Sequence, residues 1–389
     1  MTEKTRKIKL VYIANVRMPN ERAHGIQIAN TCEGVGKRGI DLTLVTSKFY
    51  DKRLLLSEHY DITQTFKHTK IFVFDIPWIP FRYFLRNFSF FFFVNVYLLT
   101  AYIKSFVARE KLVVYVRGEV ILSLIPFTWF IPIFFETHQI RNYESLYRIA
   151  LSRVRGIIVV TQGLKTKFVK EYKISQNKIL VARDSVNLEK FKSSARNREL
   201  WIQHGIPKDK KIVLYSGSLA IEKGVHTLAG TAMFVPNDVQ IVFLGGTESQ
   251  VSAFKDKYGN VKNISILGRV NYIEVPKYIA AADVLVLPDL AEFTYSNLYT
   301  SPMKLFEYMA SGRPILASRV PSLLEVLNEN SAVFFESGNS ESLAKGINSI
   351  INDDIQSNEL GMRAQEIVSE FTWEKRAEAI ISHIQNHLA

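Results

Sequence analysis

The chain has 389 residues, of which 47% are hydrophobic and 22% are charged. This balance is typical of globular proteins and excludes general disorder, and the length exceeds what one hydrophobic core usually organises, so two domains are expected. The formal charge of +12 is uneven, because residues 1–200 hold 33 Lys and Arg against 16 Asp and Glu, whereas residues 201–389 hold 16 against 21. The basic first half favours an anionic partner such as a membrane surface, a nucleic acid or an acidic acceptor.

The cysteine content and the apolar segments of the chain bear on its cellular location. The single cysteine, Cys32, cannot form an intramolecular disulfide and offers no metal-binding cluster, so a reducing, cytoplasmic location is expected. The basic N-terminus precedes an apolar run of only seven residues, 10–16, which predicts a first strand rather than a signal peptide. Residues 87–103 are apolar but interrupted by polar side chains, and fall short of the roughly 20 residues of a membrane span. A buried helix or an interfacial helix is expected there.

Short apolar runs alternate with helical stretches along the first half of the chain. This alternation predicts a parallel sheet covered by helices. A literal GxGxxG at Gly34, Gly36 and Gly39 ends a predicted helix instead of following a strand, so no dinucleotide cofactor is expected there. Strands are predicted at residues 9–15, 41–47, 70–76, 112–118, 131–137 and 156–162, and a helix at 26–38.

The same alternation restarts near residue 211, which predicts a second doubly wound domain. Residues 184–210 lack a long apolar run and are expected to form a hinge. The domains are therefore predicted as 1–185 and 186–371, and the helical tail, about 372–389, is expected to cap one of them, with the N-terminal domain as the candidate. Strands are predicted at residues 211–217, 239–246, 264–270, 283–289 and 313–319.

The most informative motif spans residues 300–318. Ser301 is expected to cap a helix and Pro302 to occupy its first position, where no backbone N–H is needed. The start of this helix, with Lys304 in its first turn, suits an anion, and Glu307 can accept two hydrogen bonds from a ribose diol. An ordinary amphipathic helix with solvated charges is the alternative. Helical spacing places four polar residues on one face: Lys304, Glu307, Tyr308 and Ser311.

A second motif follows the first strand of the second domain. The strand is expected to end at Gly217, and a helix is expected to open after Lys223 and Gly224. An ammonium group at a helix N-terminus can neutralise charge that builds up on a departing diphosphate. A solvated loop lysine is the alternative.

These two motifs, with Gly-Gly-Thr at 245–247 and Gly-Arg-Val at 268–270 between them, resemble the family 4 retaining glycosyltransferases over nearly the whole chain. The resemblance implies an α/β protein of GT-B architecture, with two Rossmann-like doubly wound domains facing a central cleft. Residues 17–30 resemble the family's first loop and helix, in which a glycine at the Gly25 position lets the backbone approach the donor phosphates. Residues 136–139 resemble the family's histidine segment, which implies that His138 contacts the transferring sugar.

Further roles follow from the resemblance by position. It implies that Lys223 binds the donor diphosphate with support from the backbone amides of Met303 and Lys304. It also implies that Glu307 holds the ribose. The turn at Arg269 and Val270 would meet the base.

The candidate catalytic residues are therefore Lys223, His138 and Glu307. Two positions depart from the family pattern, because many members have an arginine at Ser218 and the first of two glutamates at Tyr299. We interpret the second change as tuning of sugar recognition. The candidate donor-binding residues are Gly25, Gly217, Ser218, Arg269, Val270, Tyr299, Ser301, Met303, Lys304 and Glu307.

The resemblance implies retaining transfer from a nucleoside-diphosphate sugar, with UDP favoured by family frequency, to an acceptor hydroxyl. The acceptor is expected to be a glycan or a lipid-linked saccharide of cell-surface polysaccharide synthesis. The sequence contains no Asp-x-Asp pair and no His/Cys cluster, so neither a metal ion nor another cofactor is expected. The alternatives are a non-catalytic nucleotide-sugar-binding protein of the same fold and a nicotinamide-dependent oxidoreductase.

The basic charge of the first half could serve a nucleic-acid partner or a membrane partner. No nucleic-acid-binding motif is found, so a nucleic acid is not expected as a partner. The basic charge and the aromatic run Phe90–Phe93 suggest peripheral attachment to an anionic membrane, at the inner face of the cytoplasmic membrane. Aromatic residues that simply fill the domain core are the alternative.

Overall fold

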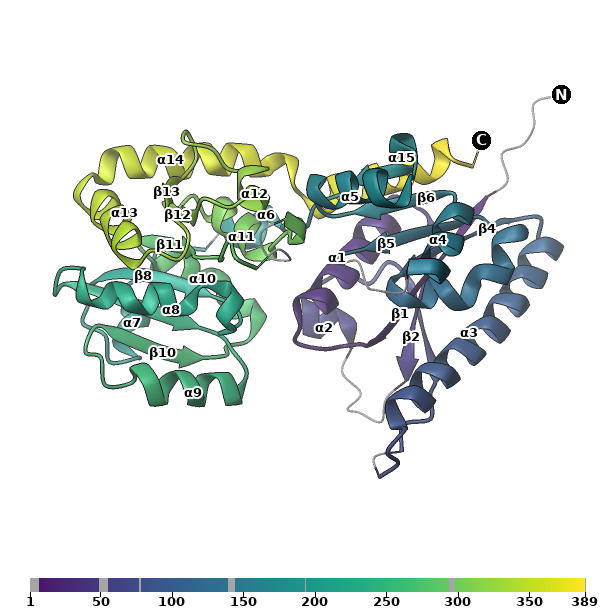
Figure 1. The fold of residues 1–389 in the computed structure, drawn as a ribbon, viewed down its shortest axis with the longest axis horizontal. Helices are drawn as coiled ribbons and strands as arrows, with labels where there is room; N and C mark the ends of the chain where they lie inside the picture. The colour runs from purple at the N-terminus through teal and green to yellow at the C-terminus, as the bar shows by residue number, and fades with distance from the viewer. Residues whose placement is uncertain are drawn as a thin grey trace. The chain divides into compact units, whose positions relative to one another are not determined.

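The computed structural model describes residues 7–48, 55–76, 78–138, 144–192, 194–293 and 298–388. The chain forms two compact units (Figure 1): unit 1 comprises residues 1–183 and 373–389, and unit 2 comprises residues 184–372. The division lies within two residues of the boundary expected from the sequence, and the C-terminal helix belongs to unit 1.

Unit 1 is built, within the described ranges, on a seven-stranded sheet in the order β3-β2-β1-β4-β5-β6-β7, with every neighbouring pair parallel. Its strands read as nearly continuous apolar runs because helices cover both faces of a parallel sheet. The strands are β1 (Ile8–Arg17), β2 (Asp41–Lys48), β3 (Lys67–Phe72), β4 (Lys111–Arg117), β5 (Ile133–Thr137), β6 (Gly156–Val159) and β7 (Ile179–Val181).

Helices cover this sheet on two sides, as right-handed crossovers in both directions from β1 require. The first helix packs against α2 and α15, whereas α3 and α4 pack against the 3₁₀ segment η1 (Figure 1). The helices are α1 (Ala23–Lys37), α2 (Leu56–Tyr60), α3 (Arg82–Val107), η1 (Gly118–Trp129), α4 (Glu144–Arg153), α5 (Gln162–Tyr172), η2 (Gln176–Lys178) and α15 (Trp373–Asn386).

Unit 2 repeats this architecture with a six-stranded parallel sheet in the order β10-β9-β8-β11-β12-β13. One apolar core lies on the side of α10 and α11 and includes Trp201 and Phe306, and another lies on the side of α8 and α13 and includes Phe243. The strands are β8 (Lys211–Ser216), β9 (Val239–Leu244), β10 (Ile264–Gly268), β11 (Val284–Leu287), β12 (Ile315–Ser318) and β13 (Val333–Phe335).

The helical segments of unit 2 connect these strands and cover them. They are α6 (Leu188–Lys192), α7 (Glu199–Ile202), η3 (Ile221–Lys223), α8 (Val225–Gly230), η4 (Thr231–Met233), α9 (Glu248–Tyr258), η5 (Tyr272–Glu274), α10 (Val275–Ala281), α11 (Met303–Ser311), α12 (Pro321–Leu324), α13 (Ser340–Asn352), α14 (Asp354–Ile367) and η7 (Val368–Glu370).

The predicted hinge at residues 184–210 is wrong. The segment contains α6 and α7, and its apolar residues Phe191 and Trp201 are buried in the core of unit 2. The Trp201 indole N–H donates to the carbonyl oxygen of Ala281 at 3.0 Å. Four scattered apolar side chains of this segment lie in the core and fix it to the unit, although they make no recognisable run in the sequence: Val186, Phe191, Trp201 and Ile206.

The three glycines of the GxGxxG pattern lie where the sequence predicts, at the end of α1 and in the turn that leads to β2. A Cβ on Gly34 would come within 2.9 Å of the backbone of Trp373 and of the Ala377 side chain in α15. Gly34 is therefore required for the close packing of α1 on the C-terminal helix.

Candidate active site

The order of the strands in unit 2 reverses between β8 and β11. In open parallel sheets, ligands bind beyond the carboxyl ends of the strands at such a reversal. The loop after β8 carries Gly217 at φ +145° and Gly224 at φ +67°. A Cβ on Gly224 would overlap the carbonyl group of Pro288, so glycine is required for the loop after β8 to meet the end of β11.

Two lysines converge on one buried carboxylate at this point. The Lys223 Nζ lies 3.2 Å from Asp289 Oδ1, and the Lys304 Nζ lies 3.6 Å from Asp289 Oδ2. Burial alone would raise the pKa of Asp289, but the two ammonium groups hold it below its usual value. Asp289 is 2% exposed. Sequence reasoning placed both lysines at the diphosphate but missed Asp289, which sits at the end of the predicted strand 283–289.

Lys304 is the more buried of the two lysines. Its Nζ lies 4.4 Å from the centre of the Tyr215 ring, and Asp289 Oδ2, 3.6 Å away, is just beyond ordinary hydrogen-bond distance. Burial lowers the pKa of Lys304 to about 8, while the Asp289 carboxylate acts in the opposite direction. Asp289 therefore helps to keep the Lys304 ammonium protonated near neutral pH.

Glu307 lies one turn further along α11. Its Oε1 accepts a hydrogen bond from the Tyr272 hydroxyl at 2.9 Å, which ties α11 to the turn that follows β10. Burial raises the pKa of Glu307 to about 7. Glu307 and Tyr308, expected on the polar face of this helix, are both buried, and the Tyr308 hydroxyl accepts a hydrogen bond from the Ser216 backbone N–H at 2.8 Å. This polar face is therefore packed inside unit 2, and the alternative of a helix with solvated charges is wrong for these two residues.

The start of α11 also differs from the expectation. The helix begins at Met303 with Pro302 as its N-cap residue, and no side chain caps it. The Ser301 hydroxyl instead accepts a hydrogen bond from the Asp184 backbone N–H at 3.0 Å, which fixes the first residue of unit 2 to this loop. By helix geometry the amides of Met303 and Lys304 still have no acceptor within the helix, so they stay candidates for an anion.

The other donor-binding candidates of unit 2 lie in the segments that follow β8 and β10 and in the residues just before α11. Ser218 is exposed, and its hydroxyl accepts a hydrogen bond from the Gln250 side chain at 3.1 Å. Arg269 and Val270 follow β10 directly, in the turn whose Tyr272 reaches Glu307. Tyr299 is half-buried just before α11.

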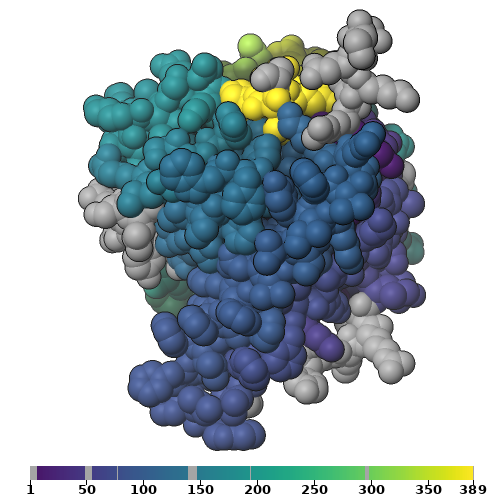
Figure 2. All heavy atoms as spheres, turned by 90° about the vertical axis from the view of Figure 1, so that its right-hand side faces the viewer, coloured from purple at the N-terminus to yellow at the C-terminus, as the bar shows by residue number. Residues whose placement is uncertain are grey.

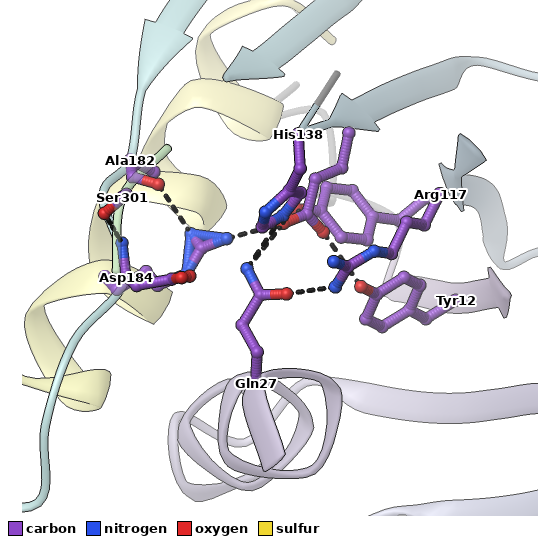
Figure 3. A network of polar contacts seen from close by, with 10 residues as sticks. Tyr12, Gln27, Arg117, His138, Ala182, Asp184 and Ser301 are labelled. Carbon is purple, nitrogen blue, oxygen red and sulfur yellow. Dashed lines mark hydrogen bonds and ion pairs between the residues drawn. The ribbon is translucent and has the colours of Figure 1, made fainter. Parts of the chain in front are cut away.

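In unit 1, the candidate His138 belongs to a network of polar contacts (Figure 3) around a buried carboxylate, Glu136, near the end of β5. Glu136 Oε2 accepts hydrogen bonds from the hydroxyls of Tyr12 and Tyr115, at 2.8 and 2.9 Å. Its Oε1 accepts from the Arg376 guanidinium at 2.6 Å. Burial alone would raise the pKa of Glu136, but Arg376 and then His138 hold it well below its usual range. Glu136 is therefore an anion at neutral pH, and both of its oxygens accept hydrogen bonds.

His138 is hydrogen-bonded to this carboxylate. Its Nε2 lies 2.9 Å from Glu136 Oε1 and 2.9 Å from the Gln27 amide nitrogen (Figure 3). Burial and the nearby Arg117 lower the pKa of His138 to about 4, so the imidazole is neutral at neutral pH. The Gln27 carbonyl oxygen accepts from Arg117, which orients the Gln27 amide nitrogen towards His138.

Two further residues, Arg376 and Gly25, make close contacts within unit 1. Arg376 comes from the C-terminal helix α15 and also donates to the carbonyl oxygen of Ala182 at 3.2 Å. A Cβ on Gly25 would overlap the hydroxyl of Tyr60 and approach the Asn20 side chain within 3.0 Å. The contact that requires a glycine at position 25 is thus made inside unit 1.

Comparisons with known proteins indicate which family the sequence of unit 2 resembles. Residues 197–367, which lie in unit 2, match the family model described as glycosyl transferases group 1. The D-inositol 3-phosphate glycosyltransferase of Corynebacterium diphtheriae is 23% identical over 65% of this chain and 65% of its own length. A capsular polysaccharide biosynthesis glycosyltransferase of Staphylococcus aureus is 22% identical over 62% of this chain and 66% of its own length. These alignments span about two thirds of the relatives' length.

Solved structures share the fold of the whole chain. Sucrose-phosphate synthase from Thermosynechococcus elongatus aligns with a TM-score of 0.77 and 17% identity, over 98% of this chain and 99% of the other. The Anabaena protein HepE, solved in complex with UDP, aligns with a TM-score of 0.72 and 17% identity, over 97% of this chain and 100% of the other. The chain therefore has two Rossmann-like units of GT-B type, and its residues 197–367 in unit 2 belong to the glycosyl transferases group 1.

Proposed function

We propose that the chain transfers a sugar, with retention of configuration, from a nucleoside-diphosphate donor bound by unit 2 to an acceptor hydroxyl. The observation that carries the proposal is the pair of ammonium groups, Lys223 and Lys304, held by Asp289 at the strand-order reversal of unit 2. Two partly buried cations, one of them in the first turn of α11, form a site for a diphosphate. The similar Anabaena protein was solved with UDP, and UDP is our proposed nucleotide.

In this proposal the protein mainly stabilises charge. The acceptor oxygen forms a bond to the anomeric carbon on the face that the diphosphate leaves, the bond between that carbon and the diphosphate oxygen breaks, and the departing phosphate oxygen takes the hydroxyl proton. Lys223 and Lys304 stabilise the negative charge that grows on the diphosphate. Glu307 holds the ribose, and neutral His138 contacts the transferring sugar.

On the acceptor side, we propose a glycan or lipid-linked saccharide of cell-surface polysaccharide synthesis, reached from the cytoplasmic face of a membrane. The similarity to the capsular polysaccharide enzyme supports this class of acceptor. The excess of basic residues in the first half of the chain supports an anionic surface as its location.

Nucleotide binding and turnover test the proposal separately. Thermal melts with UDP, GDP, ADP and TDP should show stabilisation by one of them, since a ligand at about 100 times its dissociation constant stabilises by roughly 2.7 kcal/mol. Melting curves unchanged by all four would refute a nucleotide site. A nucleotide that binds without sugar transfer to any acceptor panel would favour the non-catalytic alternative.

We expect transfer to need no divalent ion, because the two lysines supply the positive charge that a metal ion would otherwise bring to the diphosphate. Chelation with EDTA should leave the initial rate nearly unchanged, and added magnesium or manganese should not raise it. A rate that EDTA abolishes and manganese restores would contradict this expectation.

Glu307→Gln should raise the donor KM by about tenfold or more and lower kcat less, because charged hydrogen bonds to the ribose are lost while the ribose itself does not react. The carboxylate form prevails above its pKa of about 7, so donor affinity of the wild type should fall as pH drops through 7. The Gln variant should lack this fall. Subtracting the two pH profiles removes the ligand's own titration.

The matched control for this variant is Glu341→Gln, an exposed glutamate in α13. It should leave KM and its pH profile at wild-type values. Equal pH profiles for wild type and Glu307→Gln would mean that Glu307 does not hold the ribose.

A further inference from the structure

The helix α3 has apolar side chains on two opposite faces. Its inner face is buried at Phe90, Val94 and Leu98, where it packs against β1, β3, β4 and η1. Large apolar residues on its other side are 47–72% exposed and recur every three or four positions. We call them the outer stripe: Phe84, Phe88, Phe92, Val96, Leu99, Ile103 and Phe106.

The outer stripe is a continuous surface, not a scatter of single side chains. At about 1.5 Å per residue it extends along roughly 33 Å of helix. Figure 2 shows this side of unit 1, where the blue spheres of α3 lie at the surface. Just before the helix, Trp78 and Phe81 are also exposed. Contiguous apolar surface of this extent marks a contact with another molecule or a membrane.

The sequence suggested that the aromatic run Phe90–Phe93 contributes to membrane attachment, and this assignment needs correction. Of Phe90–Phe93, Phe90 is fully buried and only Phe92 belongs to the outer stripe. Among the described residues, α3 is also the one helix whose length and composition would allow it to cross a bilayer. Because its inner face is packed on the sheet of unit 1, the exposed face, and not the whole helix, is available to lipid.

Basic residues border the stripe. At about 100° per residue, Arg82, Arg86 and Lys104 fall on one common side of α3, next to the outer stripe. Residues 76–109 contain these three and Arg109 but no Asp or Glu. Unit 1 as a whole has 31 Lys and Arg against 15 Asp and Glu. An apolar face with a basic border is the composition of helices that lie in the interface of an anionic membrane.

We propose that the outer stripe of α3 is a docking surface for an anionic lipid membrane, with the helix parallel to the membrane plane and still packed on unit 1. The inference rests on the proposed membrane location of the acceptor and is independent of sugar transfer itself. A second copy of the chain fits this surface less well, because a two-fold pairing would bring identical basic borders together.

Flotation with vesicles tests the surface in the full-length protein. Wild type should float with vesicles of phosphatidylcholine and phosphatidylglycerol, less with phosphatidylcholine alone, and less as salt rises. Phe88→Ser with Phe92→Ser should weaken partitioning by about tenfold or more, since two exposed aromatic rings would no longer enter the interface. Arg82→Glu with Lys104→Glu keeps the stripe and should weaken binding to the anionic vesicles only.

The matched control replaces two exposed apolar residues of α14 in unit 2, Ile355→Ser with Met362→Ser, and should float as wild type does. Every variant should keep the thermal shift given by the nucleotide, which separates this surface from the donor site. Wild type that floats with neither vesicle, or a stripe variant that floats as well as the control, would overturn the proposal. Sedimentation of wild type as a dimer that Phe88→Ser with Phe92→Ser dissociates would overturn it in favour of an interface between copies.

Discussion

Lys223→Ala should lower kcat by on the order of 10² or more, a loss of about 2.7 kcal/mol of transition-state stabilisation. The Lys223 Nζ lies at the strand-order reversal of unit 2, 3.2 Å from Asp289. Charge on the diphosphate grows as the glycosidic bond breaks, so this ammonium group should interact more strongly with the transition state than with the bound donor. Steady-state kinetics should therefore show a larger change in kcat than in donor KM.

Asp289 makes a second explanation of such a loss possible. Without Lys223, Lys304 is the one ion-pair partner that Asp289 keeps among the described residues, 3.6 Å away, and the Asp289 carboxylate would repel the diphosphate. Combining Lys223→Ala with Asp289→Asn separates the two effects. The double variant stays slow if the ammonium group stabilises the transition state, and it recovers if repulsion by Asp289 is the cause.

The control for this series is Lys277→Ala, an exposed lysine of unit 2 paired with Glu274, which should keep wild-type kinetics. Thermal melts confirm folding of each variant. Near-normal kcat and kcat/KM in Lys223→Ala would show that the diphosphate is held elsewhere.

Arg376→Met should destabilise unit 1 by about 3–5 kcal/mol, because breaking a buried ion pair leaves the other charge uncompensated. The side chains of Arg376 and Glu136 are 1% and 0% exposed, and 2.6 Å separates their charged groups. The variant also removes the donor to the carbonyl oxygen of Ala182. Thermal melts and amide hydrogen exchange of unit 1 would measure the effect.

The loss of stability caused by Arg376→Met should depend on pH in a defined direction. The pKa of Glu136 is held well below its usual range in the folded wild type, so its stabilising contribution is present above the unfolded pKa and is lost as pH falls through the folded one. In Arg376→Met, burial raises the pKa of Glu136, and protonation can neutralise it. The difference in stability between variant and wild type should therefore shrink on acidification.

Two variants check that the effect comes from the unpaired charge. Glu136→Gln combined with Arg376→Met should be less destabilised than Arg376→Met alone, because no buried charge remains. Lys375→Met, one residue earlier in α15 and exposed, should change stability little. A double variant as unstable as Arg376→Met would assign the loss to packing and not to charge.

The sequence by itself determined the fold class and named most residues of the proposed donor site. Parallel strands buried on both faces leave continuous apolar runs, and these predicted β1, β2 and β4–β6 of unit 1 and β8–β12 of unit 2 to within a few residues. Only β3 was displaced, predicted at 70–76 but formed at Lys67–Phe72. The short edge strands β7 and β13, with three residues each, were missed because so few apolar residues make no pattern.

Tertiary structure decided what depends on residues far apart in the chain. The sequence singled out Lys223, Lys304 and Glu307 because each belongs to a local motif, but Asp289 gains its role only when β11 lies beside β8. Arg376 reaches Glu136 across 240 positions, since α15 returns to unit 1. Helical spacing could not show which apolar side of α3 is buried, because both sides are apolar and only packing on the sheet distinguishes them.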